Sequence, residues 1–486
     1  MKPSSQRPRF SRTAIRVVSY LLVLLPALLG FLYVRSFGVN LVYSDSWALV
    51  TSFAKFSSGT LSLSDLLVLH QEHWILFPHI AMLLLGTVTE WNSVAEMYLT
   101  QILLVGTLVC FLLVFRDSIK SSPAFKSALF PLSMIPVSLL VFSFVQHQNM
   151  LGGFGVTFVF AQTFGVLALY LLYVLRYDRL RTVVFVAALG SATVASFSSV
   201  PGLCVWPAGV LLLLMSPLGK PTKKVFVGLW GLAGLGIWIA YFIAYSNPDN
   251  KNPGSVLYAL GHPLGGIRYF LNLLGSTLFE KGTIQGTVPG PLLLGSESLL
   301  LVAGLLLASL ALISLVLILK DGRGLGEYSF WLSLLVWSCT ILAFIVVGRL
   351  AQQELDLQRG LAGYAHSRYT SYSILAAVAI YGLLATITFR VRSSLSTVLL
   401  VVLSGAVLLS AGFAYSRGIE VGKSVKANRE KGAHALLTYK TQPASVFYNR
   451  HYFARRRGAE VIVPRAMILE RLDYSVFADP PKARRK

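Results

Sequence analysis

Acidic and histidine side chains gather early in the chain, in the polar segment that follows the first apolar stretch. Asp45 stands in the run Tyr-Ser-Asp-Ser-Trp, and His70, Glu72 and His73 follow it before the next long apolar stretch. A carboxylate held at the edge of a membrane can take a proton from a hydroxyl group as a general base. We therefore predict that Asp45 is a catalytic base.

The neighbours of Asp45 also fit a structural role. Ser44 or Asp45 could cap a short amphipathic helix that lies along the membrane surface, with Trp47 at the start of its apolar face. The two roles are compatible. Asp65, which precedes an apolar run, is interpreted as a helix-start residue.

His70, Glu72 and His73 place three potential ligands within four residues. On a helix, His70 and His73 would share a face while Glu72 pointed elsewhere. This is not the His-Glu-x-x-His spacing of a zinc-binding helix, so a divalent metal is not favoured. Orienting an acceptor or a phosphate group is the stronger prediction for these three residues.

A second polar run consists of Gln146, His147, Gln148 and Asn149, between two apolar stretches. Polar side chains at a membrane surface are costly unless they bind something. We therefore expect Gln146, His147 and Asn149 to orient the donor or the acceptor of a reaction. The alternative, that they cap helices in a tight turn, stays open.

The third group lies in the last short polar loop before the C-terminal apolar stretches. It contains Arg349, His366 and Arg368. A guanidinium group binds phosphate through two parallel hydrogen bonds. Arg368 is the preferred phosphate contact, with Arg349 and His366 beside it.

The composition shows what must position these residues. The 486 residues are 55% hydrophobic and 13% charged, with a mean hydropathy of +0.67, whereas soluble domains carry about 25% charged residues. Apolar runs long enough to cross a bilayer recur along the chain, and helices satisfy their own backbone hydrogen bonds in lipid. An all-α polytopic membrane protein is predicted. The net charge of +22 comes from basic residues scattered between apolar runs, which indicates membrane orientation and argues against nucleic acid as a partner.

About eleven transmembrane helices are expected. The basic residues 1–13 place the N-terminus in the cytoplasm, the membrane domain covers 14–415, and the polar tail 416–486 is long enough for a small αβ cap. The expected spans are roughly 14–35, 93–115, 127–144, 153–175, 183–198, 202–216, 225–245, 297–319, 328–348, 371–390 and 394–415.

Two more apolar segments, 74–90 and 256–279, could span the membrane or lie in its interface. If they lie in the interface, all the short basic loops fall on the cytoplasmic side. The outer loops are then 37–92, 246–296 and 349–370, and all eight histidines lie outside. We adopt this topology, in which the candidate site and the C-terminal tail are extracytoplasmic.

With this topology the chain resembles the multi-spanning GT-C glycosyltransferases, over most of 14–415. These enzymes share a cytoplasmic N-terminus, one span, and a long outer loop with an early aspartate and interfacial helices. The motifs that carry the resemblance are Asp45-Ser-Trp47, His70-x-Glu-His73 followed by Phe77-Pro78, Gln146-His-x-Asn149 with Gly153-Phe154, and Ser367-Arg-Tyr369.

The resemblance implies a multi-pass enzyme of a bacterial inner (plasma) membrane that inverts the sugar configuration on transfer. Asp45 would be the base, and the donor would be a polyprenyl-phosphate-linked sugar whose phosphate contacts Arg368, Arg349 and His366. The acceptor would be a glycan, a lipid or a protein. Because serines flank Asp45, the Asp-x-Asp motif of some members is missing, and no cofactor is expected.

Two other functions fit parts of the sequence. A transporter of lipid-linked glycans would need polar residues in the middle of the membrane, and the apolar stretches contain few of them. A non-catalytic membrane scaffold is the other alternative, and it would be favoured if Asp45 proved dispensable.

Overall fold

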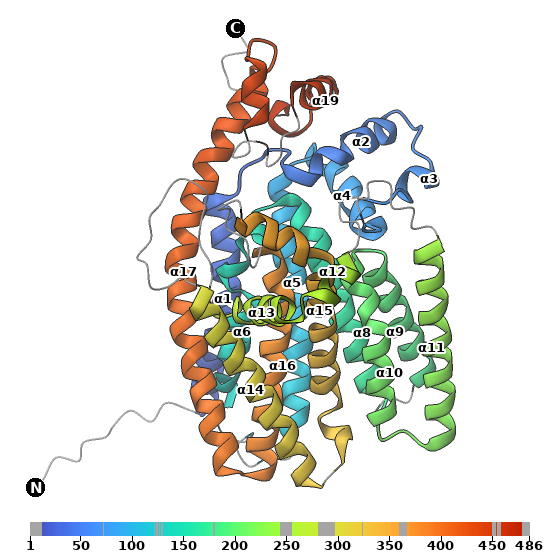
Figure 1. The fold of residues 1–486 in the computed structure, drawn as a ribbon, viewed down its shortest axis with the longest axis vertical. Helices are drawn as coiled ribbons and strands as arrows, with labels where there is room; N and C mark the ends of the chain where they lie inside the picture. Colours follow the sequence, from blue (N-terminus) through green and yellow to red (C-terminus); the bar gives the residue numbers. More distant parts are fainter. Residues whose placement is uncertain are drawn as a thin grey trace, which may run out of the picture.

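The structure is a computed structural model that describes residues 12–70, 72–120, 122, 125, 127, 130–177, 180–243, 255–279, 297–322, 324–358, 367–449, 453 and 458–478. Within these ranges the regular elements are helices and no strand occurs, so the prediction of an all-α protein is confirmed. The long helices stand side by side along the long axis of the molecule (Figure 1).

Nine helical segments of the described chain are long and apolar enough to cross a membrane, which confirms a multi-pass membrane protein. They are α1 (Arg12–Phe37), α5 (Ser93–Ile119), α8 (Val156–Val174), α11 (Lys220–Ile243), α14 (Glu297–Asp321), α15 (Ser329–Gln358), α16 (Ser367–Val391), α17 (Ser394–Leu437), and the segment Phe130–Met150 with α6 (Ile135–Val141) and α7 (His147–Met150).

The other two expected spans, 183–198 and 202–216, correspond to shorter apolar helices. These are α9 (Arg181–Ser196) and α10 (Val205–Met215). α9 packs against α8, and α10 packs against α11 and α15. Both stand among the upright helices in Figure 1.

The first polar segment forms short helices at one end of the bundle, the upper end in Figure 1. They are α2 (Val50–Ser57), α3 (Leu63–Leu66) and α4 (Leu76–Thr89). α4 covers the ambiguous segment 74–90 and has 14 residues, fewer than the roughly 20 that a span requires. Asp65 closes a capping box with Ser62 at the start of α3, as its interpretation as a helix-start residue requires.

The segment 256–279 also forms two short helices, α12 (Ser255–Gly261) and α13 (Pro263–Gly275). α13 crosses α14 closely at two glycines. A Cβ atom on Gly304 would lie 2.0 Å from the Leu271 carbonyl oxygen, and one on Gly275 would lie 1.9 Å from the Leu300 carbonyl oxygen. Only glycine permits such an approach of two backbones.

The C-terminal tail begins as a continuation of a span. α17 runs through residue 415 to Leu437, and α19 (Ala459–Arg471) then packs beside α2 at the upper end (Figure 1). Phe53 meets Tyr474 at a ring distance of 5.8 Å, and the Ser475 amide donates to the Glu90 carbonyl at 2.8 Å. The described part of the tail is therefore helical, and it covers the first polar segment.

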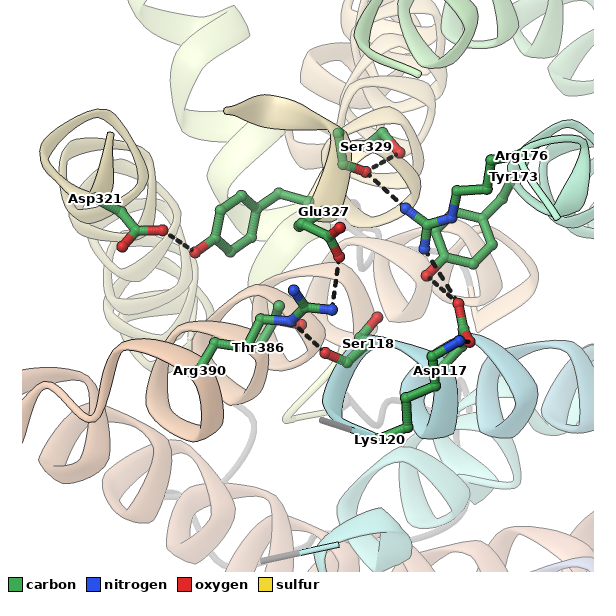
Figure 2. Close-up of polar contacts among 12 residues, drawn as sticks. Asp117, Ser118, Lys120, Tyr173, Arg176, Asp321, Glu327, Ser329, Thr386 and Arg390 are labelled. Atoms are coloured by element: carbon green, nitrogen blue, oxygen red, sulfur yellow. Dashed lines mark hydrogen bonds and ion pairs between the residues drawn. The ribbon is translucent and has the colours of Figure 1, made fainter. Parts of the chain in front are cut away.

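The opposite, lower end carries the turns between α10 and α11, between α14 and α15, and between α16 and α17 (Figure 1). Figure 2 shows polar contacts there among residues of α5, α8, α14, α15 and α16 and the turns next to them. Asp117 accepts hydrogen bonds from Tyr173 and Arg176, each at 3.1 Å, and Arg390 pairs with Glu327 at 2.6 Å. The short loops that were predicted to be cytoplasmic thus share one end of the bundle.

Candidate functional site

Asp45 lies at the upper end, in a turn of 3-10 helix (Ser44–Leu49) that leads into α2. Tyr43 holds the N-cap position in an extended conformation, and its side chain makes no capping hydrogen bond. Asp45 therefore belongs to the first turn and is not the cap. Ser44 has a φ of 55°, a strained conformation for serine of the kind that clusters at functional sites. Trp47 is buried, as the predicted amphipathic helix requires, and only 5% of Asp45 is exposed.

The Asp45 carboxylate lies between a histidine and an arginine. Its Oδ1 is 3.9 Å from His70 Nε2, and its Oδ2 is 3.9 Å from Arg368 Nη1. Both separations exceed hydrogen-bond distance, yet they are short enough for a strong charge interaction where water is excluded. Residues from the first and the third predicted group therefore meet around one carboxylate.

His70 and His73 close a turn between α3 and α4. The His70 amide donates to the His73 carbonyl at 2.8 Å, and the His73 amide donates back at 3.0 Å. The two residues are not on a helix, so the condition under which they would share a helical face is not met. The His70 ring instead packs on Phe154 at 4.9 Å.

Glu72, at the tip of that turn, forms an ion pair with Arg349 of α15. The Tyr241 hydroxyl donates to the Glu72 carbonyl at 3.0 Å and so ties the turn to α11. Burial opposes the ionisation of Glu72, but nearby positive charges, including that of Arg349, lower its pKa below the ordinary value.

His73 stands beside this pair. Burial lowers the pKa of His73, against the opposing attraction of Glu72. The Val200 amide lies 3.4 Å from His73 Nδ1 and donates to it. At neutral pH the turn accordingly presents an ionised Glu72 and an uncharged His73.

Arg368 is the second residue of α16, and its guanidinium group projects over two aromatic rings. The Cζ atom is 5.2 Å from the Tyr369 ring centre and 5.9 Å from that of Phe158. Its Nε is buried and has no hydrogen-bond partner among the described residues. Because a buried donor without a partner is costly, this group is suited to bind an anion that enters the site.

The run 146–149 holds the first turn of α16 in place. Gln148 accepts from the Arg368 amide at 3.3 Å, and Asn149 donates to the Arg368 carbonyl at 3.0 Å. His147 Nδ1 lies 3.3 Å from the hydroxyl of Ser367, while Gln146 donates to the Val141 carbonyl at 2.6 Å. These contacts resemble the helix-capping alternative, except that the helix they cap is α16.

One candidate residue falls outside this arrangement, and no set of metal ligands is found among the described residues. His366 lies outside the described residues. In the part of the chain that the structure describes, no group of three or more His, Cys, Asp or Glu side chains comes together as a metal site.

Sequence reasoning missed Arg429, a buried arginine of α17 near the site. Its guanidinium donates to the Leu151 carbonyl and lies 4.5 Å from the Tyr43 ring centre. It thus connects the residue before the strained Ser44 to the end of the polar run. A signal was present in the spacing, because Val421, Val425, Gly432 and Leu436 recur at helical intervals on the same face of α17 as Arg429.

We call the residues Asp45, His70, Glu72, His73, Arg349 and Arg368 the Asp45 cluster. It consists of two carboxylates, two guanidinium groups and two imidazoles at the upper end of the bundle. No protein-family model, curated protein or solved structure matches this chain. The chemistry of the cluster must therefore be argued from its own geometry.

Proposed function

We propose that the chain is a membrane glycosyltransferase that moves a sugar from a polyprenyl-phosphate-linked donor to an acceptor hydroxyl, with inversion at the anomeric carbon. The observation that supports this most directly is the position of Asp45 beside Arg368, 3.9 Å from Oδ2 to Nη1. An inverting transfer places the base and the departing phosphate on opposite faces of the anomeric carbon, so in this proposal Asp45 and Arg368 face one site and separate to admit the donor sugar between them.

In the proposed reaction, Asp45 takes the proton of the acceptor hydroxyl as its oxygen attacks the anomeric carbon. The bond from that carbon to the phosphate oxygen breaks, and the electron pair leaves with polyprenyl phosphate. Arg368 stabilises the negative charge on the departing phosphate through its Nε and Nη groups.

The other members of the Asp45 cluster have supporting roles in this proposal. Arg349 is paired with Glu72 and would contribute a second positive charge to the phosphate region. His70 would orient the Asp45 carboxylate and the acceptor. His366 is proposed as a further phosphate contact, and no divalent metal takes part.

The proposed location is the bacterial inner membrane, with the Asp45 cluster facing outward and the N-terminus in the cytoplasm. The basic loops support this orientation, since they share the end of the bundle opposite to the cluster. The short helices α4, α12 and α13 would border the groove that admits the lipid tail of the donor.

The test uses the full chain in nanodiscs with a panel of polyprenyl-phosphate hexoses and pentoses and a membrane extract as the acceptor source. Release of polyprenyl phosphate and transfer of labelled sugar are measured for the wild type, Asp45→Asn and Asp65→Asn. General-base catalysis contributes about 10²–10⁴ in rate, so Asp45→Asn should lose that factor. Asp65→Asn is the matched control, because Asp65 belongs to an exposed capping box.

Equal turnover by wild type and Asp45→Asn would rule out the general-base role. No turnover by the wild type with every donor would favour the scaffold alternative. A transporter of lipid-linked glycans has one point in its favour, since Gln101 of α5 and Gln162 of α8 are buried inside spans. Movement of intact donor across the bilayer without cleavage would support it.

A further inference from the structure

A recess lies at the lower end of the bundle, opposite to the end that carries the Asp45 cluster. It is formed where α5 and α8 end, and its volume is about 480 Å³, within the range of about 300–1,000 Å³ that ligand sites enclose. Its lining consists of Leu113, Arg116, Asp117, Tyr170, Tyr173, Val174, Tyr177 and Leu180.

The one carboxylate of the lining is already neutralised. Asp117 pairs with Lys120 at 2.5 Å and with Arg176 at 3.1 Å, and it also accepts from the Tyr173 hydroxyl (Figure 2). The two cations are held in turn by aromatic rings, with Lys120 Nζ 4.4 Å from the Tyr177 centre and Arg176 Cζ 3.9 Å from the Tyr173 centre. Asp117 is therefore a fixed part of the wall.

Arg116 remains as the cation that faces the recess. It is exposed, and no described carboxylate lies within ion-pair distance of it. With Lys120 and Arg176 there are three cations around one carboxylate. The C-terminal ends of α5 and α8 would repel an anion, and this surplus of positive charge reverses that preference.

The recess changes character along the helices. On α5 the apolar Leu113 comes about one turn before Arg116, and Val174 ends α8 just before Arg176. Tyr170, Tyr173 and Tyr177 line the recess beside them, and tyrosine is common where hydrocarbon meets the headgroup layer of a bilayer. A phospholipid has the same order, with acyl chains inside and a phosphate at the surface.

From these observations we infer that the recess binds the headgroup of an anionic phospholipid. Its phosphodiester contacts Arg116, and its acyl chains lie along Leu113 and Val174. Basic pockets between transmembrane helices on the cytoplasmic side are suited to such headgroups. The site is separate from the proposed transfer reaction and does not depend on it.

The test is native mass spectrometry of the full chain in detergent with added phosphatidylglycerol or phosphatidylcholine. The wild type is compared with Arg116→Gln, Arg116→Lys and Arg392→Gln. Arg392 is the matched control, because it is an exposed arginine of the α16–α17 turn at the same end and does not line the recess. Circular dichroism and thermal unfolding in phosphatidylcholine alone verify that each variant is folded.

The wild type should retain one phosphatidylglycerol at least about tenfold better than phosphatidylcholine, because both lipids offer a phosphodiester to Arg116 but choline adds a positive charge beside Lys120 and Arg176. Arg116→Gln should remove that preference, while Arg116→Lys keeps most of it and Arg392→Gln keeps all of it. Equal retention of the two lipids, or an unchanged preference in Arg116→Gln, would overturn the inference. So would full competition by millimolar inorganic phosphate, which would indicate a site for the free anion.

Discussion

Asp45 and Arg368 lie 3.9 Å apart, Oδ2 to Nη1, although one belongs to the first polar segment and the other to the first turn of α16. Two other features of the structure bring these two side chains together. The Ser44 turn directs Asp45 inward, and Gln148 with Asn149 holds the α16 backbone at Arg368. The carboxylate and the guanidinium are therefore positioned by different parts of the chain, and each can be tested separately.

The role of Arg368 is tested by two substitutions. Arg368→Lys keeps the charge but loses the planar pair of donors, and Arg368→Gln loses both. If Arg368 binds the donor phosphate, turnover should fall roughly tenfold to a hundredfold with Lys and further with Gln. The measurement is the dependence of the transfer rate on donor concentration and, separately, on acceptor concentration. Wild-type rates and donor dependence in both variants would transfer the phosphate role to Arg349.

The turn that carries His73 should make the protein sensitive to acid. Burial lowers the pKa of His73, so below its ordinary pKa of about 6.5 the unfolded chain binds a proton that the folded chain does not. Stability is therefore full above that pH and falls as the pH drops, by up to about 1.4 kcal/mol per pH unit for this one group. Thermal unfolding in detergent from pH 8 to pH 5 measures the slope.

The matched substitutions for this test are His73→Gln and His434→Gln. His73→Gln should flatten the slope, whereas His434→Gln should preserve it, because His434 is an exposed residue of α17. An identical slope in all three proteins would show that the acid sensitivity arises elsewhere.

The orientation of the bundle can be measured with single cysteines. Cys110, Cys204 and Cys339 are first replaced by alanine, and then Ser394→Cys and Thr441→Cys are introduced, both at exposed positions. In intact cells an impermeant maleimide should label position 441 at once and position 394 only after the membrane is permeabilised. The reverse pattern would place the Asp45 cluster on the cytoplasmic side. The proposed reaction would then need a lipid-linked sugar donor that faces the cytoplasm.

The crossing of α13 over α14 should not tolerate a methyl group. Gly304→Ala would place its Cβ 2.0 Å from the Leu271 carbonyl oxygen, and overpacking of this kind costs about 1–3 kcal/mol. Gly231→Ala in α11 is the control, since nothing lies within 4 Å of its Cβ position, and it should be neutral or slightly stabilising. Thermal unfolding compares the two, and equal midpoints would contradict the close crossing.

The upright helices and the gathering of the Asp45 cluster at one end could be predicted from sequence. Apolar runs of bilayer length predict spans, and the side on which basic loops fall predicts which polar segments share an end. That reasoning places Asp45 and Arg368 on the same side. It cannot say that Asp45 contacts Arg368 while Arg349 pairs with Glu72, because such pairings depend on how the spans pack.

Other features carry no local signal at all. The extension of α17 past residue 415 joins an apolar half to a polar half, and hydropathy marks only the first. The crossing at Gly275 and Gly304 is equally hidden, since glycine is common in membrane helices for several reasons. The turn at His70 and His73 depends on backbone pairing between these two residues, which their side chains do not indicate.

The packing of the tail on the first polar segment has a consequence for how the protein is made. Phe53 stacks on Trp91 at 3.8 Å and is covered from the other side by Tyr474. Ribosomes add about 5–20 residues per second, so roughly tens of seconds separate the synthesis of Phe53 from that of Tyr474. Throughout that interval the Phe53 ring lacks the contact that Tyr474 later makes with it. This cover is therefore completed only after all the described spans have been made, and a ribosome that stops before Tyr474 releases a chain whose first loop lacks it.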